Sequence, residues 1–289
     1  MAARRHAGGP QRRSGTRPLL RAGLWTTSTG SVELVPERGD PLSWTLYVNG
    51  VPSSPVHLGD PAVLEFEYLQ WMADAVDVAA PAPAPAPLRA VHLGGGACAL
   101  PRHLEAVRPG SRQVVVELDA ELARLVRAWL DLPRSPRLRI RVDDARAGLA
   151  AQPDASADLV VRDVFAGDTT PEHVSTVEFL ADAARVLAPG GLYLANVVDR
   201  TSRVGLRAEV AAAQRVFASV ALALEPGVLR GRRHGNAVLV GSDAALPVAE
   251  LVRRLGSGAA RAAVLHDDAL RALSSGVTAP RDGGADRRT

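Results

Sequence analysis

The 289-residue sequence has one cysteine, no lysine and few aromatic residues (4%). A single cysteine excludes an internal disulfide framework. No apolar run reaches the roughly 18 residues of a membrane-spanning helix, and the N-terminus lacks the apolar stretch of a signal peptide. The seven histidines do not cluster with cysteine or paired carboxylates at ligand spacing. These absences predict a cytoplasmic protein without a metal site.

Basic charge is concentrated at the N-terminus. A net charge of +3 and a pI near 9.7 would suit a nucleic-acid partner. Residues 1–21, however, hold six arginines and no acidic residue, so the rest of the chain is net acidic. We therefore expect a disordered basic tail over 1–21 and neither a nucleic-acid nor a membrane partner.

Residues 22–80 predict a small antiparallel β module followed by a linking helix. Short alternating runs are separated by turn formers, and Asn49-Gly50 between two of them is a strong hairpin signal. Asp60-Pro61 is expected to open the helix, whose apolar residues then recur at helical spacing. The alternating Pro/Ala segment 81–87 predicts an extended linker between this module and the main domain.

Strands and helices alternate over 88–275, which predicts a parallel sheet with helices on both faces. Expected strands are 89–93, 113–118, 138–142, 158–162 and 191–197, followed by an antiparallel pair near 220–230 and 236–241. Expected helices lie near 99–107, 120–130, 173–187 and 203–218, with one or two short helices within 246–275. The fold class is thus α/β, a Rossmann-like mostly parallel sheet in which the five strands and the late pair make seven. Residues 276–289 are assigned to a polar tail.

A glycine loop marks the end of the first strand of this domain. Gly94, Gly95 and Gly96 follow Val91-His-Leu and open the next helix. Glycines there allow a tight turn and close approach of a ligand, and the helix N-terminus can hold an anionic group. Gly94-x-Gly96-x-x-Ala99 also fits the dinucleotide fingerprint, which is a weak signal alone.

Acidic residues follow the next two strands. Glu117 ends the second strand, 21 residues after Gly96, where a carboxylate can accept hydrogen bonds from ribose hydroxyls. Asp144, before Ala145, follows the third strand, where it could accept from an adenine amino group. Each acid has an alternative role as a helix cap or solvated loop residue. The ordered set of three signals favours a nucleoside site.

The fourth strand ends in Asp163, followed by a loop to Pro171 that contains Asp168. The next helix closes with Leu187-Ala-Pro-Gly-Gly191, a turn that class I methyltransferase-type folds often show. Cys98 stands at a helix start, where a thiol pKa can fall. We expect it instead to be a small buried residue.

On these motifs the chain resembles the spermidine synthase family (polyamine aminopropyltransferases), in particular divergent bacterial members, over about 30–242. The resemblance also covers the N-terminal β module and Glu65-Phe-Glu-Tyr68. It implies a transferase that moves an aminopropyl group from decarboxylated S-adenosylmethionine to a small-molecule amine. A methyl group from S-adenosylmethionine itself is the alternative. No metal is implied, and a homodimer is left open.

The resemblance also implies roles for single residues. Gly94, Gly95 and Gly96 with Glu117 would hold the donor's sugar, and Asp144 with Ala145 its adenine. Asp163 would be the catalytic carboxylate that receives a proton from the attacking amine. Tyr68 and Asp168 would contact the acceptor, and the N-terminal β module would wall the acceptor pocket over the carboxyl edge of the sheet.

Four departures from the family pattern fall on the side of the amine groups. Ala97 replaces the aspartate of the usual Gly-Gly-Gly-Asp-Gly-Gly loop, and Ala166 replaces a second aspartate after Asp163. Leu69 and Ser53 stand where the family has polar residues, a glutamine in the latter case. The nucleoside site is therefore predicted to persist and the polyamine site to be altered.

Two other classes of function stay open. A non-catalytic nucleoside-binding protein is favoured by the four departures. An NAD-dependent oxidoreductase could use the glycine loop, but the absence of lysine excludes a Tyr-x-x-x-Lys catalytic pair.

Overall fold

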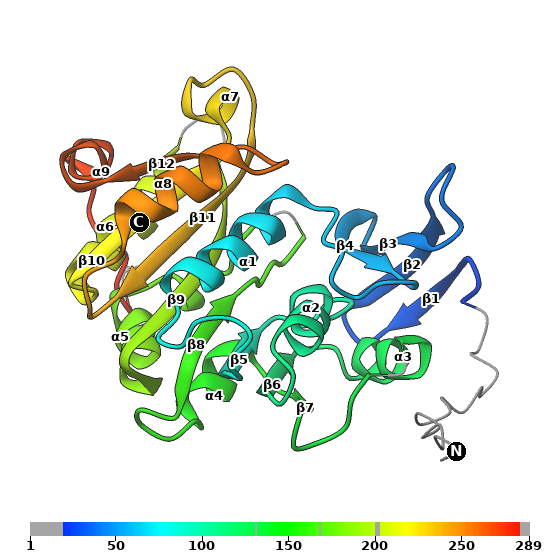
Figure 1. Ribbon diagram of the computed structural model, residues 1–289. Coiled ribbons are helices and arrows are strands. Elements are labelled where there is room, and N and C mark those ends of the chain that lie inside the picture. The colour runs from blue at the N-terminus through cyan, green and yellow to red at the C-terminus, as the bar shows by residue number, and fades with distance from the viewer. Residues whose placement is uncertain (1–19, 131, 168, 200–202, 284–289) are drawn as a thin grey trace, which may run out of the picture.

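The computed structural model describes residues 20–130, 132–167, 169–199 and 203–283. They form a large sheet flanked by helices and, beside it, a separate four-stranded antiparallel sheet (Figure 1). All but two residues of the predicted basic tail, and 284–289 of the predicted polar tail, lie outside the described residues. Among the described residues, no helix is long and apolar enough to cross a bilayer.

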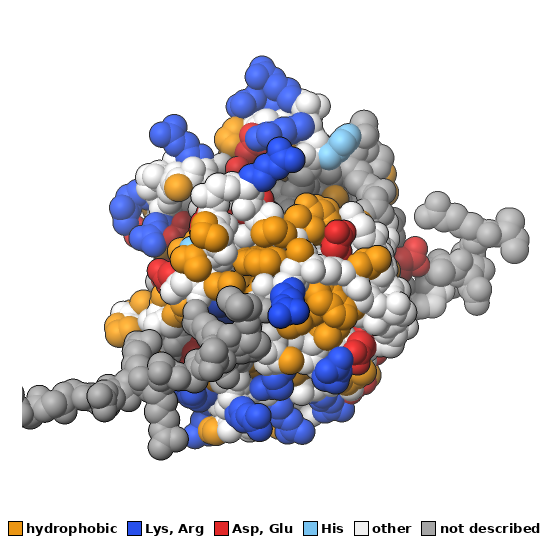
Figure 2. Space-filling view, turned by 90° about the vertical axis from the view of Figure 1, so that its right-hand side faces the viewer, with side chains coloured by type: hydrophobic (Ala, Val, Ile, Leu, Met, Phe, Trp, Pro, Cys, Tyr) orange, Lys and Arg blue, Asp and Glu red, His pale blue; other side chains and the backbone are white. Residues whose placement is uncertain are grey.

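The N-terminal sheet is a meander with strand order β1-β2-β3-β4. Its strands are β1 (Gly23–Thr27), β2 (Gly30–Pro36), β3 (Ser43–Val48) and β4 (Val51–His57). The predicted hairpin turn is present: Asn49 and Gly50 both have positive φ, as a tight β3–β4 connection requires. Figure 2 faces this side of the molecule and shows hydrophobic side chains gathered in its middle, with arginines above and below.

The large sheet has strand order β12-β10-β11-β9-β8-β5-β6-β7. The parallel strands are β5 (Arg89–Leu93), β6 (Arg112–Glu117), β7 (Leu138–Val142), β8 (Ala157–Arg162) and β9 (Leu187–Asp199). The strands β10 (Ser219–Leu224), β11 (Gly235–Ser242) and β12 (Ala263–His266) pair antiparallel with their neighbours, and β11 and β12 run opposite to the parallel strands. The mostly parallel α/β sheet and the separate antiparallel β module confirm the predicted fold class.

Four details differ from the sequence prediction. The strand expected near 220–230 ends at Leu224 and is followed by a short helix, Pro226–Leu229. The sheet has eight strands within the described residues, not seven, because β12 adds an edge strand whose four half-buried residues are too short for a periodic signal. Residues 145–150, left unassigned, form a short helix. The linking helix begins at Glu67 rather than at Asp60, because Asp60 accepts the N–H of Ala62 in a turn instead.

Helices cover both faces of the large sheet. One face carries α1 (Glu67–Ala79), α2 (Ala99–Val107), α3 (Ala120–Leu130) and α8 (Val248–Ser257). The other carries α4 (Ala145–Ala150), α5 (Val177–Val186), α6 (Val204–Val216) and α9 (Asp267–Ser274). The short α7 (Pro226–Leu229) and the 3₁₀ turn Glu172–Val174 lie in connections.

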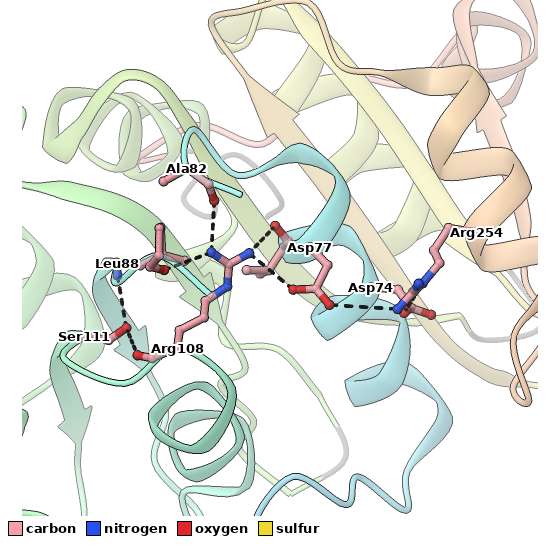
Figure 3. A network of polar contacts seen from close by, with 9 residues as sticks. Asp74, Asp77, Ala82, Leu88, Arg108, Ser111 and Arg254 are labelled. Atoms are coloured by element: carbon pink, nitrogen blue, oxygen red, sulfur yellow. Dashed lines mark hydrogen bonds and ion pairs between the residues drawn. The ribbon is translucent and has the colours of Figure 1, made fainter. Parts of the chain in front are cut away.

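A buried arginine holds the Pro/Ala segment in place (Figure 3). The fully buried Arg108 donates to the carbonyls of Ala82 and Ala86, at 2.9 and 3.1 Å, and pairs with Asp77 of α1 at 3.2 Å. Arg254 of α8 binds Asp74 on the same helix α1 at 2.7 Å. Segment 81–87 is therefore fixed to the C-terminal end of α1 by these bonds.

The end of the described chain also packs on the domain. Ala279 is buried, and the N–H of Val177 donates to the carbonyl of Pro280 at 3.0 Å. Arg281 pairs with Glu178 at 3.0 Å. Residues 276–283, assigned to a polar tail from the sequence, are thus bound against the start of α5.

Asp119 joins the two sheets. Its carboxylate accepts hydrogen bonds from the N–H and hydroxyl groups of Ser28 and Thr29, in the β1–β2 turn, at 2.6–3.3 Å. It also accepts the N–H groups of Glu121 and Leu122 at the start of α3, both at 3.0 Å. Burial would raise the pKa of Asp119, but these bonds to the ionised form outweigh it and hold the pKa well below its ordinary value.

We expect Asp119→Ala to lower the free energy of unfolding by about 3 kcal/mol, because it removes a helix cap and several charge-assisted hydrogen bonds. The lowered pKa means that this stabilisation is complete above the unfolded-state pKa of about 4 and is lost as the pH falls below it. Urea unfolding at pH 7 and pH 3 measures both effects, with Glu121→Gln, a partly exposed carboxylate at the start of α3, as control. Equal stability losses at the two pH values would contradict the assignment.

Candidate functional site

A cavity of about 800 Å³ lies between the N-terminal sheet and the carboxyl ends of the parallel strands. Residues 48–54 of the β3–β4 hairpin form one wall. The opposite side is formed by the glycine loop, the ends of β6 and β8, the segment 163–167 and the end of β9. In α/β sheets of this kind, ligands bind outside the carboxyl ends of the strands. The N-terminal module thus lies over the strand ends, as the sequence predicted.

The glycine loop packs too closely against its neighbours to tolerate side chains. Gly94 has φ +90°, and a Cβ there would lie 2.1 Å from the carbonyl oxygen of Asp163. A Cβ on Gly96 would lie 2.4 Å from the hydroxyl of Ser54 in β4. The loop is therefore in contact with both sheets.

The side chain of Glu117, at the end of β6, binds the backbone of the glycine loop. Its Oε2 accepts the N–H groups of Gly95 and Gly96, at 2.9 and 3.2 Å, and its Oε1 accepts the N–H of Asp119 at 2.9 Å. Burial is the largest influence on its pKa and raises it, although these three bonds oppose the shift. The carboxylate lines the cavity. Oε2 already accepts two N–H groups, whereas Oε1 accepts one and keeps acceptor capacity for a ligand hydroxyl.

Asp144 caps a helix and lines the same cavity. Its Oδ1 accepts the N–H groups of Arg146 and Ala147 at the start of α4, and its Oδ2 lies 2.9 Å from Nε2 of His173. Burial would raise the pKa of Asp144, but the bond to His173 and the N–H groups keep it below its ordinary value. Ala145 lines the cavity beside it. Asp144 therefore both caps α4 and lines the cavity.

Asp163, at the end of β8, is held by two side chains. Tyr68 of α1 donates from its hydroxyl to Oδ2 at 3.0 Å, and Asn196 of β9 donates from Nδ2 to Oδ1 at 2.9 Å. Burial is the largest influence and raises the pKa of Asp163, while these bonds and the nearby Arg162 oppose the rise. All three side chains line the cavity, so Tyr68 faces the pocket at Asp163 as expected from the sequence.

The positions that depart from the family pattern have different surroundings. Ala97 is buried among apolar side chains of the N-terminal sheet and α3, and its N–H donates to Ser54 at 3.1 Å. Leu69 is also buried. Ser53 and Ala166 line the cavity, whereas Asp168 lies outside the described residues.

Cys98 is 1% exposed, and burial raises the pKa of its thiol to about 12. It is a packing residue, as expected. Within the described part of the chain, no three His, Cys, Asp or Glu side chains are grouped to hold a metal ion.

Sequence reasoning missed Asn196, although a signal existed. Asn196 is 2% exposed in the otherwise apolar run Leu192–Val198, and a polar residue in such a strand needs a partner. Its Oδ1 is buried without a hydrogen-bond partner among the described residues. Phe66, Phe165 and Asn236 also line the cavity. Phe66 lies in the Glu65-Phe-Glu-Tyr68 run but was given no role, and no pattern in the sequence pointed to Phe165 or Asn236.

No family model matches the sequence. The chain is similar to a probable spermidine synthase of solved structure from Corynebacterium glutamicum, with 41% identity, a TM-score of 0.85, and coverage of 93% of this chain and 99% of that one. Polyamine aminopropyltransferases from Vibrio vulnificus and Mycobacterium tuberculosis are 30% and 41% identical over 115 and 109 residues. Those segments span 38% and 35% of this chain and only 38% and 21% of the two curated relatives.

More distant structures show the fold alone. A spermidine synthase from Thermotoga maritima is 17% identical with a TM-score of 0.60, and human methyltransferase-like protein 13 is 22% identical with a TM-score of 0.53. The protein thus has the Rossmann-like fold of the class I methyltransferases. Its extensive match to the Corynebacterium structure places it more narrowly: the chain belongs to the spermidine synthase family.

We expect Gly94→Ala to lower the free energy of unfolding by about 2 kcal/mol or more. The added Cβ would overlap a backbone oxygen, and alanine would have to adopt a positive φ. Gly205→Ala in α6 is the control, since a Cβ there meets nothing within 4 Å. The free energy of unfolding of Gly205→Ala should rise by roughly 0.5–1 kcal/mol. Chemical denaturation of both variants decides the matter; equal stabilities would rule out the close contact.

Proposed function

We propose that the protein transfers an aminopropyl group from decarboxylated S-adenosylmethionine to a small-molecule amine, with methyl transfer from S-adenosylmethionine as the alternative. In this assignment Glu117 holds the ribose and Asp144 with Ala145 the adenine. Asp163 is the catalytic carboxylate, and Tyr68 positions it. Family membership supports the class of reaction, and the chemistry of the cavity supports the residue roles.

The arrangement around Asp163 is the observation that carries the proposal. A carboxylate whose pKa is raised by burial lies at a strand end, facing a cavity whose other strand ends carry Glu117 and Asp144. Tyr68 and Asn196 each occupy one of its oxygens and fix its orientation, while each oxygen retains a second lone pair. The carboxylate can therefore receive a proton from a bound amine without moving.

The chemical step needs such a group. A primary amine is almost wholly protonated at neutral pH, and its ammonium form cannot attack until it loses a proton. Asp163 would take that proton, or would hold the nitrogen in place while the proton passes to water. The Oδ1 of Asn196 could accept a second N–H of the amine. The amine nitrogen then forms a bond to the carbon beside the sulfonium. The carbon–sulfur bond breaks with its electron pair remaining on sulfur, which releases methylthioadenosine from the decarboxylated donor.

The amine side of the site supports an altered acceptor preference. The cavity lining that contains Asp163 also contains the apolar side chains of Phe66, Phe165 and Ala166. A diamine would place its distal ammonium among these side chains, where an unpaired charge is costly. Asp168 is the group we propose for such an ammonium, if one is bound. We therefore propose that putrescine is a poor acceptor.

Glu117→Ala should weaken the binding of methylthioadenosine about a hundredfold, because the charge-assisted hydrogen bonding to the ribose and the support of the glycine loop are both lost. Titration calorimetry measures this, and Glu117→Gln is the matched control. Gln keeps an acceptor for the glycine loop and should bind with intermediate affinity. Unchanged affinity in Glu117→Ala would remove this residue from the donor site.

Asp163→Asn should lower the transfer rate about a hundredfold or more while leaving methylthioadenosine binding intact, because only the proton acceptor is removed. With Asp163 ionised as the active form, the rate should rise with pH through a pKa above the ordinary value near 4. Product analysis with decarboxylated donor and a panel of monoamines and diamines provides the measurement. Rapid spermidine formation from putrescine would refute the altered site, and Asp168→Ala then tests the distal anchor.

The buried alanine at position 97 favours one second candidate, a nucleoside-binding protein without catalysis. It predicts tight methylthioadenosine binding and no transfer to any amine in the same panel. An NAD-dependent oxidoreductase is less favoured, because the family match gives it no support.

A further inference from the structure

A buried cluster of charged and polar groups lies directly behind the catalytic carboxylate. Arg162 is the last residue of β8, next to Asp163, and its side chain is fully buried. It forms an ion pair with Glu209 of α6 and donates from Nη1 to the hydroxyl of Thr170 at 3.0 Å. Tyr193 of β9, 1% exposed, is its third polar neighbour.

This cluster is not explained by stability. Removing a guanidinium and a carboxylate from water costs several kcal/mol per ion, and a well-packed apolar pair of similar volume is often as stable or more stable. The Nε–H of Arg162, moreover, has no acceptor among the described residues. Every other residue of β8 after Asp158 is a buried Leu or Val. The strand would therefore pack without a charge at position 162.

The contacts of Arg162 connect the parts that surround Asp163. Asp163 and Thr170 are the two ends of the segment 163–170. Arg162 precedes the first end and its side chain binds the second, so Arg162 joins the two ends. Glu209 fixes the guanidinium to α6, and Tyr193 lies on the strand that supplies Asn196. Alternation along β8 directs Arg162 to the α6 face and Asp163 to the α1 face, where Tyr68 holds it.

We propose that Arg162, held in place by Glu209, is a positioning residue that anchors the Thr170 end of the segment and sets the charge environment of Asp163. The inference rests on the proposed function only in treating Asp163 as the proton acceptor. The cluster acts from behind the strand and does not touch the substrate.

The electrostatic part has a definite sign. The groups facing Asp163 are Tyr68 from α1, Asn196 from β9 and, behind it, Arg162; those facing Arg162 are Glu209 and Tyr193. Tyr68 and Tyr193 both have pKa values raised by burial and remain neutral hydrogen-bond partners. Arg162 is thus the cation that favours the ionised form of Asp163. Removing it should raise the pKa of Asp163.

The test compares Arg162→Met/Glu209→Leu with wild type in the full chain, without donor or acceptor. The pKa of Asp163 is measured by carboxyl NMR, with its signal assigned through Asp163→Asn. It should rise by about one unit in the double variant. The amide of Ala166, which donates to Thr169, should exchange with solvent about tenfold faster. The melting temperature should be unchanged or higher.

Two further variants keep the outcome clear. Glu209→Gln retains the cation, so it should speed exchange at Ala166 without raising the pKa of Asp163; it also serves if the double variant does not fold. Arg108→Met removes the other fully buried arginine described above, remote from the cavity, and should change neither quantity. If Asp163 and Ala166 are unaffected in the double variant, or the exchange rate in Glu209→Gln equals that of wild type, the positioning role is wrong. Because no ligand is used, that failure is distinct from a failure of methylthioadenosine binding or transfer.

Discussion

The candidate site depends on the hydrogen bonds that the Asp119 carboxylate accepts from both the N-terminal sheet and α3. The N-terminal sheet spans only residues 23–57, below the size at which a chain usually folds alone, so its position relative to the larger sheet must come from contacts between them. Asp119 binds the β1–β2 turn and the start of α3 with the same two oxygens, and its own N–H binds Glu117. The β1–β2 turn of the N-terminal sheet, the start of α3 and the side chain of Glu117 are therefore held by one residue.

The fold was predictable because its signals are local. Alternation of apolar strands with amphipathic helices predicted the parallel sheet, and Asn49-Gly50 predicted the hairpin. The edge strand β12 could not be predicted, since its four residues are defined by pairing with β10 rather than by their own pattern. The late start of α1 has a different origin, because Asp60 forms a local turn that competes with helix capping.

The site was predictable only in part. Glu117, Asp144 and Asp163 were recognisable because each ends a strand, and the ends of parallel strands meet at one edge of the sheet. Their partners depend on contacts between segments far apart in the chain: Asn196 with Asp163, His173 with Asp144, and Ser54 with the glycine loop. Polar residues inside apolar strands would have been the usable signal, and both Asn196 and Arg162 carry it.

The absence of lysine has a structural counterpart in the two buried arginines. Arg108 distributes its donors over three backbone carbonyls and a carboxylate, and Arg162 over a hydroxyl and a carboxylate on different elements. A planar guanidinium can join several acceptors in fixed directions, whereas a compact ammonium cannot span them. Arginine abundance set by composition alone would fill surface positions. At these two buried positions, by contrast, each guanidinium joins acceptors on separate segments of the chain.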